Sequence, residues 1–171
     1  MTMKVLIIGY RRSGKDTLAE IWEERFGIKY ESSSMAAARL FIYDELKDKY
    51  GYSSFEECYE DRMDRRKEWY DLITVFNSED PARLAKIMLE TSDVYVGMRS
   101  GIEVNSCKEQ EIFDLIVWVD AEERVGKEST ESCTVTKEDA DIIITNNDTE
   151  EVFRVKALKL GEVLFNGKIR V

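Results

Sequence analysis

The stretch from Lys4 to Thr17 constrains this chain more than any other part of it. An apolar run ends at Gly9, and four residues separate that glycine from the pair Gly14-Lys15. A strand, a glycine-rich loop and a helix in this order are typical of a phosphate-binding loop. The main-chain N–H groups, the positive end of the helix and the lysine ammonium all attract phosphates. The sequence therefore predicts a nucleoside triphosphate site, although a glycine turn between strand and helix also occurs without one.

The residues around this loop extend the predicted cofactor site. Asp16 stands where Ser or Thr usually follows the lysine and touches Mg²⁺. Its carboxylate could hold the metal directly or through water, or serve only to favour the positive helix end. Thr17 could bond an α-phosphate oxygen. We therefore expect ATP and Mg²⁺ as cofactors, with Asp16 as the metal-binding residue. The expected ATP-binding residues are Gly9, Arg12, Ser13, Gly14, Lys15, Asp16, Thr17, Arg124 and Asn146.

Composition limits the remaining classes of protein. The 171 residues suffice for one domain with a proper core. No apolar run is long enough to span a membrane, and three cysteines without C-x-x-C spacing fit the cytoplasm. The chain has no histidine, so any catalytic base must be a carboxylate. A net charge of −10 argues against broad nucleic-acid binding but allows a local basic cleft.

Apolar segments alternate with segments of helical character along the chain. The strands expected from this pattern are 4–9, 28–31, 94–97, 115–119 and 142–144. The expected helices are 13–26, 35–50, one from Ser53 or Ser54 to Phe76, 81–90, one after Gly101, and 150–164. We expect N-caps among Ser32-Ser33-Ser34, at Ser53 or Ser54, and at Thr149. Apolar strands in this alternation predict an α/β fold, a five-stranded parallel sheet with helices on both faces. We expect one domain over 1–171, with its ligands at the carboxyl ends of the strands.

Two segments are candidates for closing the site. Residues 32–90 form an all-helical insertion between the second and third strands, where small P-loop kinases bind the phosphoryl acceptor. Residues 121–138 form a polar, lid-like segment. Closure matters because an open site would transfer the phosphoryl group to water.

Arginines in and after the insertion are candidate phosphate ligands. Arg62 and Arg66 share a predicted helix face with Trp69, so they could grip a phosphate while a base stacks on the ring. A solvated, salt-bridged helix would show the same pattern. Arg99 follows the third strand, where it could neutralise the transferring phosphate, with Glu103 holding it by an i,i+4 contact. A simple surface ion pair is the alternative.

Several of these motifs resemble a known enzyme group. The segment 12–17, Arg-Ser-Gly-Lys-Asp-Thr, resembles the deoxynucleoside monophosphate kinases of tailed bacteriophages. The segment from Gly97 through Arg99 to Glu103 looks like that family's D-x-R-x-x-x-E with the first Asp replaced. Asp16 would then take over part of the metal binding. Residues 140–151 are similar to the last strand and helix of these enzymes and of dephospho-coenzyme A kinases.

A narrower resemblance covers nearly the whole chain. Its motifs are Ser32-Ser33-Ser34, Tyr59-Glu60-Asp61-Arg62, Arg66 with Trp69, Tyr95-Val96-Gly97-Met98-Arg99 and Trp118-Val119-Asp120. Together they resemble short phage P-loop kinases of thymidine hypermodification, which phosphorylate the 5-hydroxymethyl group of 5-hydroxymethyluracil in phage DNA. The resemblance implies a P-loop NTPase fold of the nucleoside monophosphate kinase type, working in the cytoplasm of an infected host.

The resemblance also implies roles and partners. Lys15 and Arg99 would stabilise the γ-phosphoryl group in transfer, and Asp61 would act as base or orient the acceptor. The residues expected to position the acceptor are Ser33, Arg62, Arg66, Trp69 and Glu103. The partners would be ATP and hydroxymethyluracil-containing DNA, with no membrane. A kinase of free deoxynucleoside monophosphates and a non-catalytic nucleotide-binding regulator are the alternatives; the oligomeric state stays open.

Overall fold

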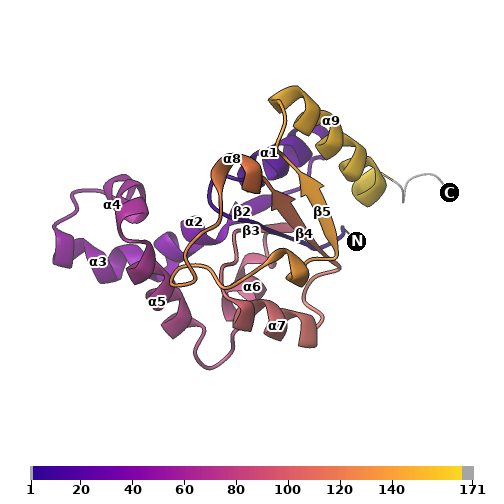
Figure 1. The fold of residues 1–171 in the computed structure, drawn as a ribbon. Coiled ribbons are helices and arrows are strands. Elements are labelled where there is room, and N and C mark those ends of the chain that lie inside the picture. Colours follow the sequence, from indigo (N-terminus) through magenta and orange to yellow (C-terminus); the bar gives the residue numbers. More distant parts are fainter. Residues whose placement is uncertain (1, 167–171) are drawn as a thin grey trace.

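Five parallel strands form the centre of the fold, in the order β2-β3-β1-β4-β5 (Figure 1). The computed structural model describes residues 2–166. The strands are β1 (Val5–Ile8), β2 (Tyr30–Ser32), β3 (Val94–Val96), β4 (Leu115–Asp120) and β5 (Ile142–Thr145). The predicted sheet is confirmed, and the largest error in a strand boundary is at β2, which begins two residues later than expected. In register, Val5 of β1 lies between Val94 of β3 and Leu115 of β4.

The helices lie between the strands as the sequence pattern indicated. Their bounds are α1 (Lys15–Phe26), α2 (Ser33–Ala37), α3 (Tyr43–Tyr50), α4 (Phe55–Asp61), α5 (Arg66–Phe76), α6 (Arg83–Met88), α7 (Gly101–Glu109), α8 (Glu122–Val125) and α9 (Glu150–Gly161). A π-helical turn over Ala38–Ile42 joins α2 to α3, and another over Glu162–Asn166 follows α9. Three predicted N-caps are confirmed, because the side chains of Ser32, Ser54 and Thr149 accept hydrogen bonds from backbone amides three residues later.

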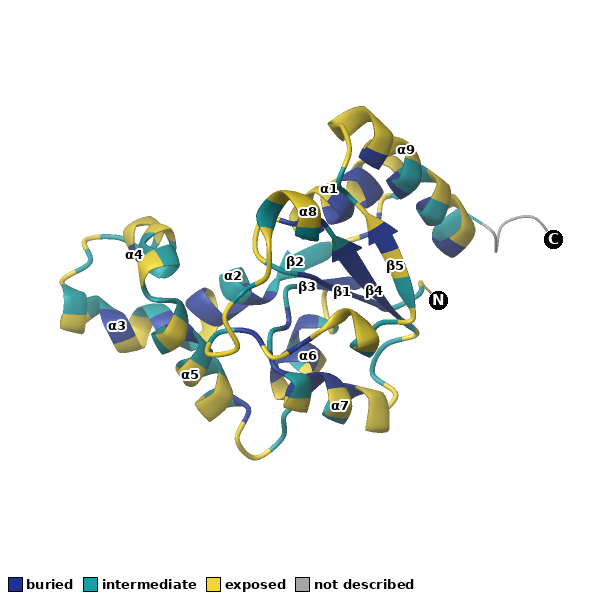
Figure 2. Ribbon diagram, viewed as in Figure 1, coloured by how far each residue is buried: buried dark blue, intermediate teal, exposed yellow. Residues whose placement is uncertain are grey.

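The three central strands, β3, β1 and β4, are apolar and largely buried because helices cover the sheet on both sides. Successive side chains of a strand point to opposite faces. In β1, Leu6 and Ile8 pack into one core cluster with residues of α2, α6 and α7, whereas Val5 and Ile7 pack into the other with residues of α1 and α9. In Figure 2 the strands β1, β3 and β4 are mostly dark, whereas β2 is half-buried and β5 is partly exposed, and the outer faces of the helices are exposed.

One predicted helix is interrupted. The expected continuous helix from Ser53 or Ser54 to Phe76 is wrong: α4 ends at Asp61, a 3-10 turn covers Arg62–Asp64, and α5 begins at Arg66. Arg65 leaves the helical region, with φ −120° and ψ 23°. The Arg62 side chain donates to the Tyr59 carbonyl oxygen at 2.8 Å, which satisfies one of the acceptors freed at the end of α4.

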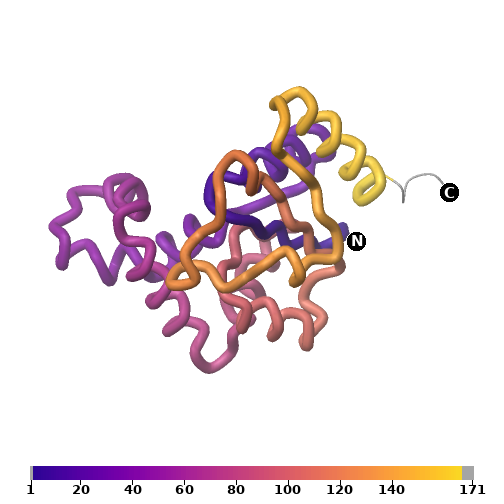
Figure 3. The backbone as a smooth tube through the Cα atoms, viewed as in Figure 1, coloured from indigo at the N-terminus to yellow at the C-terminus, as the bar shows by residue number. Residues whose placement is uncertain are grey.

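The insertion extends the molecule to one side of the sheet. All elements between β2 and β3 are helices or helical turns. Figures 1 and 3 show α3 and α4 projecting away from the strands while α5 returns toward them. Within the described part of the chain, no helix combines the length and apolar character needed to cross a membrane.

Candidate active site

The predicted phosphate-binding loop joins β1 to α1 in a tightly wound conformation. Gly14 has a φ of 103°, a left-handed value that favours glycine. A Cβ atom there would lie 2.5 Å from Asn146 Nδ2. That amide donates to the Ser13 carbonyl oxygen at 2.8 Å, so the residue after β5 fixes the loop. This contact gives Asn146 a loop-positioning place beside the site, and its expected contact with ATP stays a prediction.

Lys15 is buried at the start of α1. Its side chain is 9% exposed, and Nζ donates to the Tyr10 carbonyl oxygen at 2.8 Å across the loop. Burial and, to a smaller extent, the nearby charge of Arg99 lower the pKa of Lys15 to about 8, against the opposing carboxylates of Asp16 and Glu128. A bound anion would stabilise an ammonium in this environment, and the role of Lys15 as a phosphate ligand stays a prediction.

A cavity of about 320 Å³ opens beside the loop, at the carboxyl ends of the strands. It is lined by nine predicted site residues: Arg12, Lys15, Asp16, Ser33, Arg62, Arg66, Trp69, Arg99 and Glu103. Further lining comes from Arg11, Ser32, Ser34, Tyr59, Tyr70, Tyr95 and Met98. The phosphate loop, the insertion and the end of β3 therefore meet at one site, although they are far apart in sequence.

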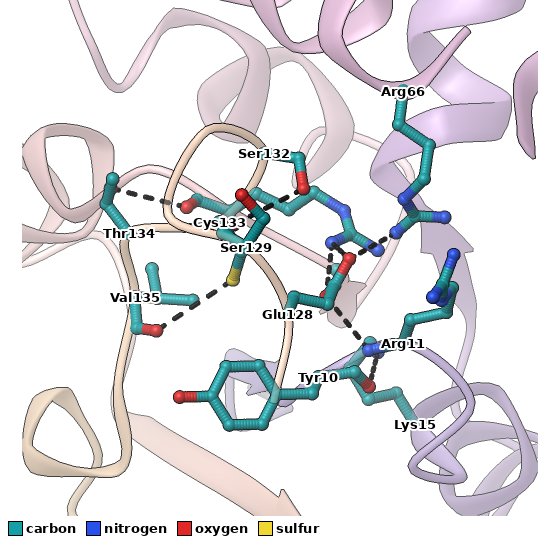
Figure 4. A network of polar contacts seen from close by, with 12 residues as sticks. Tyr10, Arg11, Lys15, Arg66, Glu128, Ser129, Ser132, Cys133, Thr134 and Val135 are labelled. Carbon is teal, nitrogen blue, oxygen red and sulfur yellow. Dashed lines mark hydrogen bonds and ion pairs between the residues drawn. The ribbon is translucent and has the colours of Figure 1, made fainter. Parts of the chain in front are cut away.

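An unpredicted carboxylate, Glu128, joins these three elements (Figure 4). Its oxygens accept from Arg66 Nη2 and Arg99 Nη1, both at 2.6 Å, and from the Arg11 backbone N–H at 2.9 Å. The carboxylate is 5% exposed. Burial raises the pKa of Glu128, but Arg99 and Arg66 outweigh that effect and hold the pKa below its ordinary value. Only its place in the polar 121–138 segment could have drawn attention to it.

Glu103 does not hold Arg99, which corrects the predicted i,i+4 contact. The Glu103 carboxylate instead accepts a hydrogen bond from Asn77 Nδ2, while Asn77 Oδ1 accepts from the Leu84 N–H at 3.0 Å. Both Asn77 atoms are thus engaged, which fixes the amide and the carboxylate. Glu103 is 6% exposed, and burial raises its pKa to about 7, against the hydrogen bonds from the Asn77 side chain and the Ser100 backbone, which lower it. It lines the cavity as a carboxyl group able to gain or lose a proton near neutrality.

Asp61 lies elsewhere. Its carboxylate accepts from the Tyr52 hydroxyl at 2.5 Å and from Arg65 Nε at 3.1 Å, and these bonds lower its pKa. Asp61 is not among the residues that line the cavity. The structure therefore does not bring the expected base to the site, because the break after α4 turns this residue toward the insertion's own contacts.

The predicted shared helix face of Arg62, Arg66 and Trp69 is also wrong in its geometry, since the break separates Arg62 from α5. All three still reach the cavity. The Arg62 guanidinium lies 3.8 Å from the centre of the Tyr59 ring, and the Tyr59 and Trp69 rings meet edge to face with centroids 6.3 Å apart. These contacts form an aromatic wall with cationic groups beside it.

The two expected donor-side residues outside the loop have defined places. Arg124 Nε donates to the Asn146 carbonyl oxygen at 2.6 Å, which links α8 to the end of β5. Thr17 is exposed in the first turn of α1. Neither lines the cavity, so a role with ATP stays a prediction for both.

Gly97 marks the end of β3, where the family pattern has Asp. Its φ is 97°, so a side chain at this position would be strained. Ser33 Oγ donates to the Gly97 carbonyl oxygen at 2.9 Å, which ties the start of the insertion to β3. The position is used for backbone geometry, while Asp16, in the first turn of α1, lines the cavity.

Two buried side-chain polar atoms lack hydrogen-bond partners within residues 2–166, and both belong to predicted site residues. They are Ser13 Oγ in the phosphate loop and Trp69 Nε1 in the cavity wall. Buried polar groups are nearly always paired in folded proteins, so unpaired ones are typical of ligand sites.

Three kinases are among the solved structures that are similar to this chain. Dephospho-CoA kinase from Campylobacter jejuni matches with a TM-score of 0.53 at 15% identity, over 98% of this chain and 100% of that one. A gluconokinase from Sinorhizobium meliloti 1021 matches with a TM-score of 0.52 at 12% identity, over 98% and 95%. Shikimate kinase from Acinetobacter baumannii, in complex with shikimate, gives 0.50 at 14% identity, over 99% and 97%.

The chain shares its fold with these three kinases. This confirms the predicted fold class, a parallel five-stranded P-loop domain. No protein-family model matches the sequence, and no curated protein does. The identities of 12% to 15% establish the fold alone, so the chemistry has to be argued from the site.

Proposed function

We propose that this chain is an ATP-dependent phosphotransferase that moves the γ-phosphoryl group to a hydroxyl of a pyrimidine deoxynucleotide. One observation carries the proposal: a buried lysine in a glycine-rich loop opens onto a cavity that also contains Arg66 and Arg99. A triphosphate and an acceptor would meet there, with cations placed where charge develops during transfer.

On the donor side, the loop amides and Lys15 would hold the β- and γ-phosphates. Asp16 lines the cavity next to Lys15 and fits a Mg²⁺ ion, which commonly keeps several waters and takes one or two carboxylates plus phosphate oxygens. The described residues contain no group of three metal-ligating side chains, so phosphate oxygens and waters would supply most of the ligands of the ion. Bound Mg²⁺ would neutralise phosphate charge.

On the acceptor side, the hydroxyl oxygen attacks the γ-phosphorus while the bond to the β–γ bridging oxygen breaks and ADP leaves. The hydroxyl proton passes to a carboxylate. Glu103 fits this role better than Asp61, because it lines the cavity and its pKa of about 7 suits proton transfer near neutral pH. Ser33 and Trp69 would position the acceptor, and Arg62 would bind its phosphate.

The acceptor we propose is the 5-hydroxymethyl group of 5-hydroxymethyluracil in DNA. The aromatic wall supports a base, and the cavity volume of about 320 Å³ is at the lower end for a small ligand, which favours one nucleotide over a long stretch of strand. A target base would then leave the stack to reach the site. The chain's net charge of −10 favours the second candidate, a free deoxynucleoside monophosphate.

Phosphate transfer from labelled ATP tests the proposal. The protein with Mg²⁺ is mixed with DNA containing 5-hydroxymethyluracil, with the same DNA containing thymine, and with each free deoxynucleoside monophosphate. We expect label on the modified DNA only. Label on a free nucleotide would establish the second candidate. ATP binding without label on any acceptor would indicate a nucleotide-binding regulator.

A further inference from the structure

Glu128 occupies the point where the cationic groups of the site converge. It comes from the segment after α8, and its partners come from the phosphate loop, from α5 and from the residues after β3. Figure 4 shows its carboxylate between Arg66 and the backbone at Arg11, close to Lys15. One buried carboxylate thus faces two guanidinium groups and a loop amide.

These donors are the kind that bind phosphate. Arginine forks match the oxygens of carboxylates and phosphates alike, and main-chain N–H groups of a phosphate loop bind anions. Because Arg66 and Arg99 share a single carboxylate and Lys15 lies nearby, the cluster keeps an excess of positive charge. A phosphate group, with more oxygens and more charge than a carboxylate, would satisfy the same donors more fully.

The segment that carries Glu128 is held at both of its ends, so a movement of Glu128 can stay confined to the residues between them. At one end, the N–H of Gly126, which follows α8, donates to the Glu122 carbonyl oxygen. On the other side, the Thr134 backbone N–H donates to the Arg99 carbonyl oxygen at 2.8 Å, and Thr134 Oγ1 accepts from the Gly101 N–H at 2.9 Å. Between these anchors Lys127, Ser129, Thr130 and Glu131 are exposed. Removing Glu128 from the cluster therefore requires movement of a few residues only.

We propose that Glu128 is an internal substitute for a phosphate group, which a bound polyphosphate displaces. The proposal rests on the proposed function and concerns the regulation of that site. Without nucleotide, Glu128 pairs with Arg66 and Arg99 and holds its segment against the phosphate loop. When phosphates arrive, the two arginines and the Arg11 N–H transfer to them, and the segment around Glu128 is released.

Tripolyphosphate without Mg²⁺ tests this by titration calorimetry, because it probes phosphate binding alone. The variant Glu128→Gln keeps the size of the side chain and removes its charge. We expect it to bind tripolyphosphate about tenfold more tightly than the wild type, the factor expected if the closed form is populated to about nine-tenths. The matched control is Glu131→Gln, which removes the same charge from an exposed residue of the same segment and should bind as the wild type does.

Equal or weaker binding by folded Glu128→Gln would overturn the proposal, since Glu128 would then only position the arginines. Hydrogen exchange of the wild type gives a second measurement that needs no variant. Amides of residues 127–132 should exchange faster with tripolyphosphate than without it, and unchanged exchange would also overturn the proposal. Failure of the proposed function is distinguishable, because tighter tripolyphosphate binding without phosphate transfer to any acceptor would leave this inference intact.

Discussion

Replacing Glu103 by Gln tests the electrostatics of the cavity directly. The carboxyl group is buried and its pKa is raised from 4.5 to about 7, so the folded protein binds its proton more tightly than the unfolded chain does. Its contribution to stability is therefore full below pH 4.5 and is lost as the pH rises through about 7. Gln resembles the protonated carboxyl group, can accept the same Asn77 bond, and does not ionise.

The size of the effect follows from the pKa difference. A shift from 4.5 to about 7 corresponds to about 3 kcal/mol, because each pKa unit is worth about 1.4 kcal/mol. Wild type and Glu103→Gln should thus differ by less than about 1 kcal/mol in free energy of unfolding at pH 5, close to the unfolded-state pKa. At pH 8 the variant should be the more stable by up to about 3 kcal/mol.

Urea denaturation at pH 5 and pH 8 measures this difference, and comparing the two proteins at each pH cancels the other titrating groups. Glu109→Gln is the matched control, since Glu109 is an exposed carboxylate on the same helix, α7. It should leave the pH dependence of unfolding unchanged. If Glu103→Gln also leaves it unchanged, the carboxyl group is ionised at no cost and cannot be the proton acceptor that we propose.

Four further predictions concern the loop and the cavity wall. Lys15→Met should lower kcat about 10²-fold or more while the protein stays folded, because the charge on the transferring phosphate loses its ammonium partner; steady-state kinetics with circular dichroism checks this. Since the pKa of Lys15 is about 8, kcat/KM for ATP should fall as the pH rises through that value, which a pH–rate profile measures. Gly14→Ala should cost about 1–3 kcal/mol of stability in thermal unfolding, because a side chain would face a positive φ and the Asn146 amide. Trp69→Phe removes a buried N–H that has no partner within residues 2–166. If that N–H bonds the acceptor, the variant should have a higher KM for the acceptor and nearly the same KM for ATP. A KM for the acceptor equal to that of the wild type would assign the ring to packing alone.

The parts of the fold that the sequence predicted are those set by local pattern. The strands appear as apolar runs, and the caps at Ser32, Ser54 and Thr149 follow from short-range side-chain chemistry. The break between α4 and α5 was missed because the mostly charged segment 60–66 contains no helix-breaking Gly or Pro. The turn there is accompanied by a bond from the Arg62 side chain to the backbone. Local propensity cannot specify such an interruption.

The site was predictable to the same extent. Lys15 and Arg99 follow strands, so topology alone brings them to one sheet edge. The partner of Arg99 was missed because i,i+4 spacing suggested Glu103, whereas Glu128 is 29 residues away in sequence and reaches it through tertiary structure. Asp61 was misplaced for the related reason that its surroundings depend on where α4 ends.

The distribution of charge explains how an acidic chain can bind an anionic substrate. Six basic residues line the cavity, Arg11, Arg12, Lys15, Arg62, Arg66 and Arg99, against the carboxyl groups of Asp16 and Glu103. Glu103 is held near its point of protonation by burial, and Glu128 is shared by two arginines. The local excess of positive charge therefore persists although the chain has a net charge of −10. Such a surface attracts the phosphates of one nucleotide into the cavity while the acidic exterior repels extended nucleic acid, so a DNA acceptor would have to present a single displaced nucleotide.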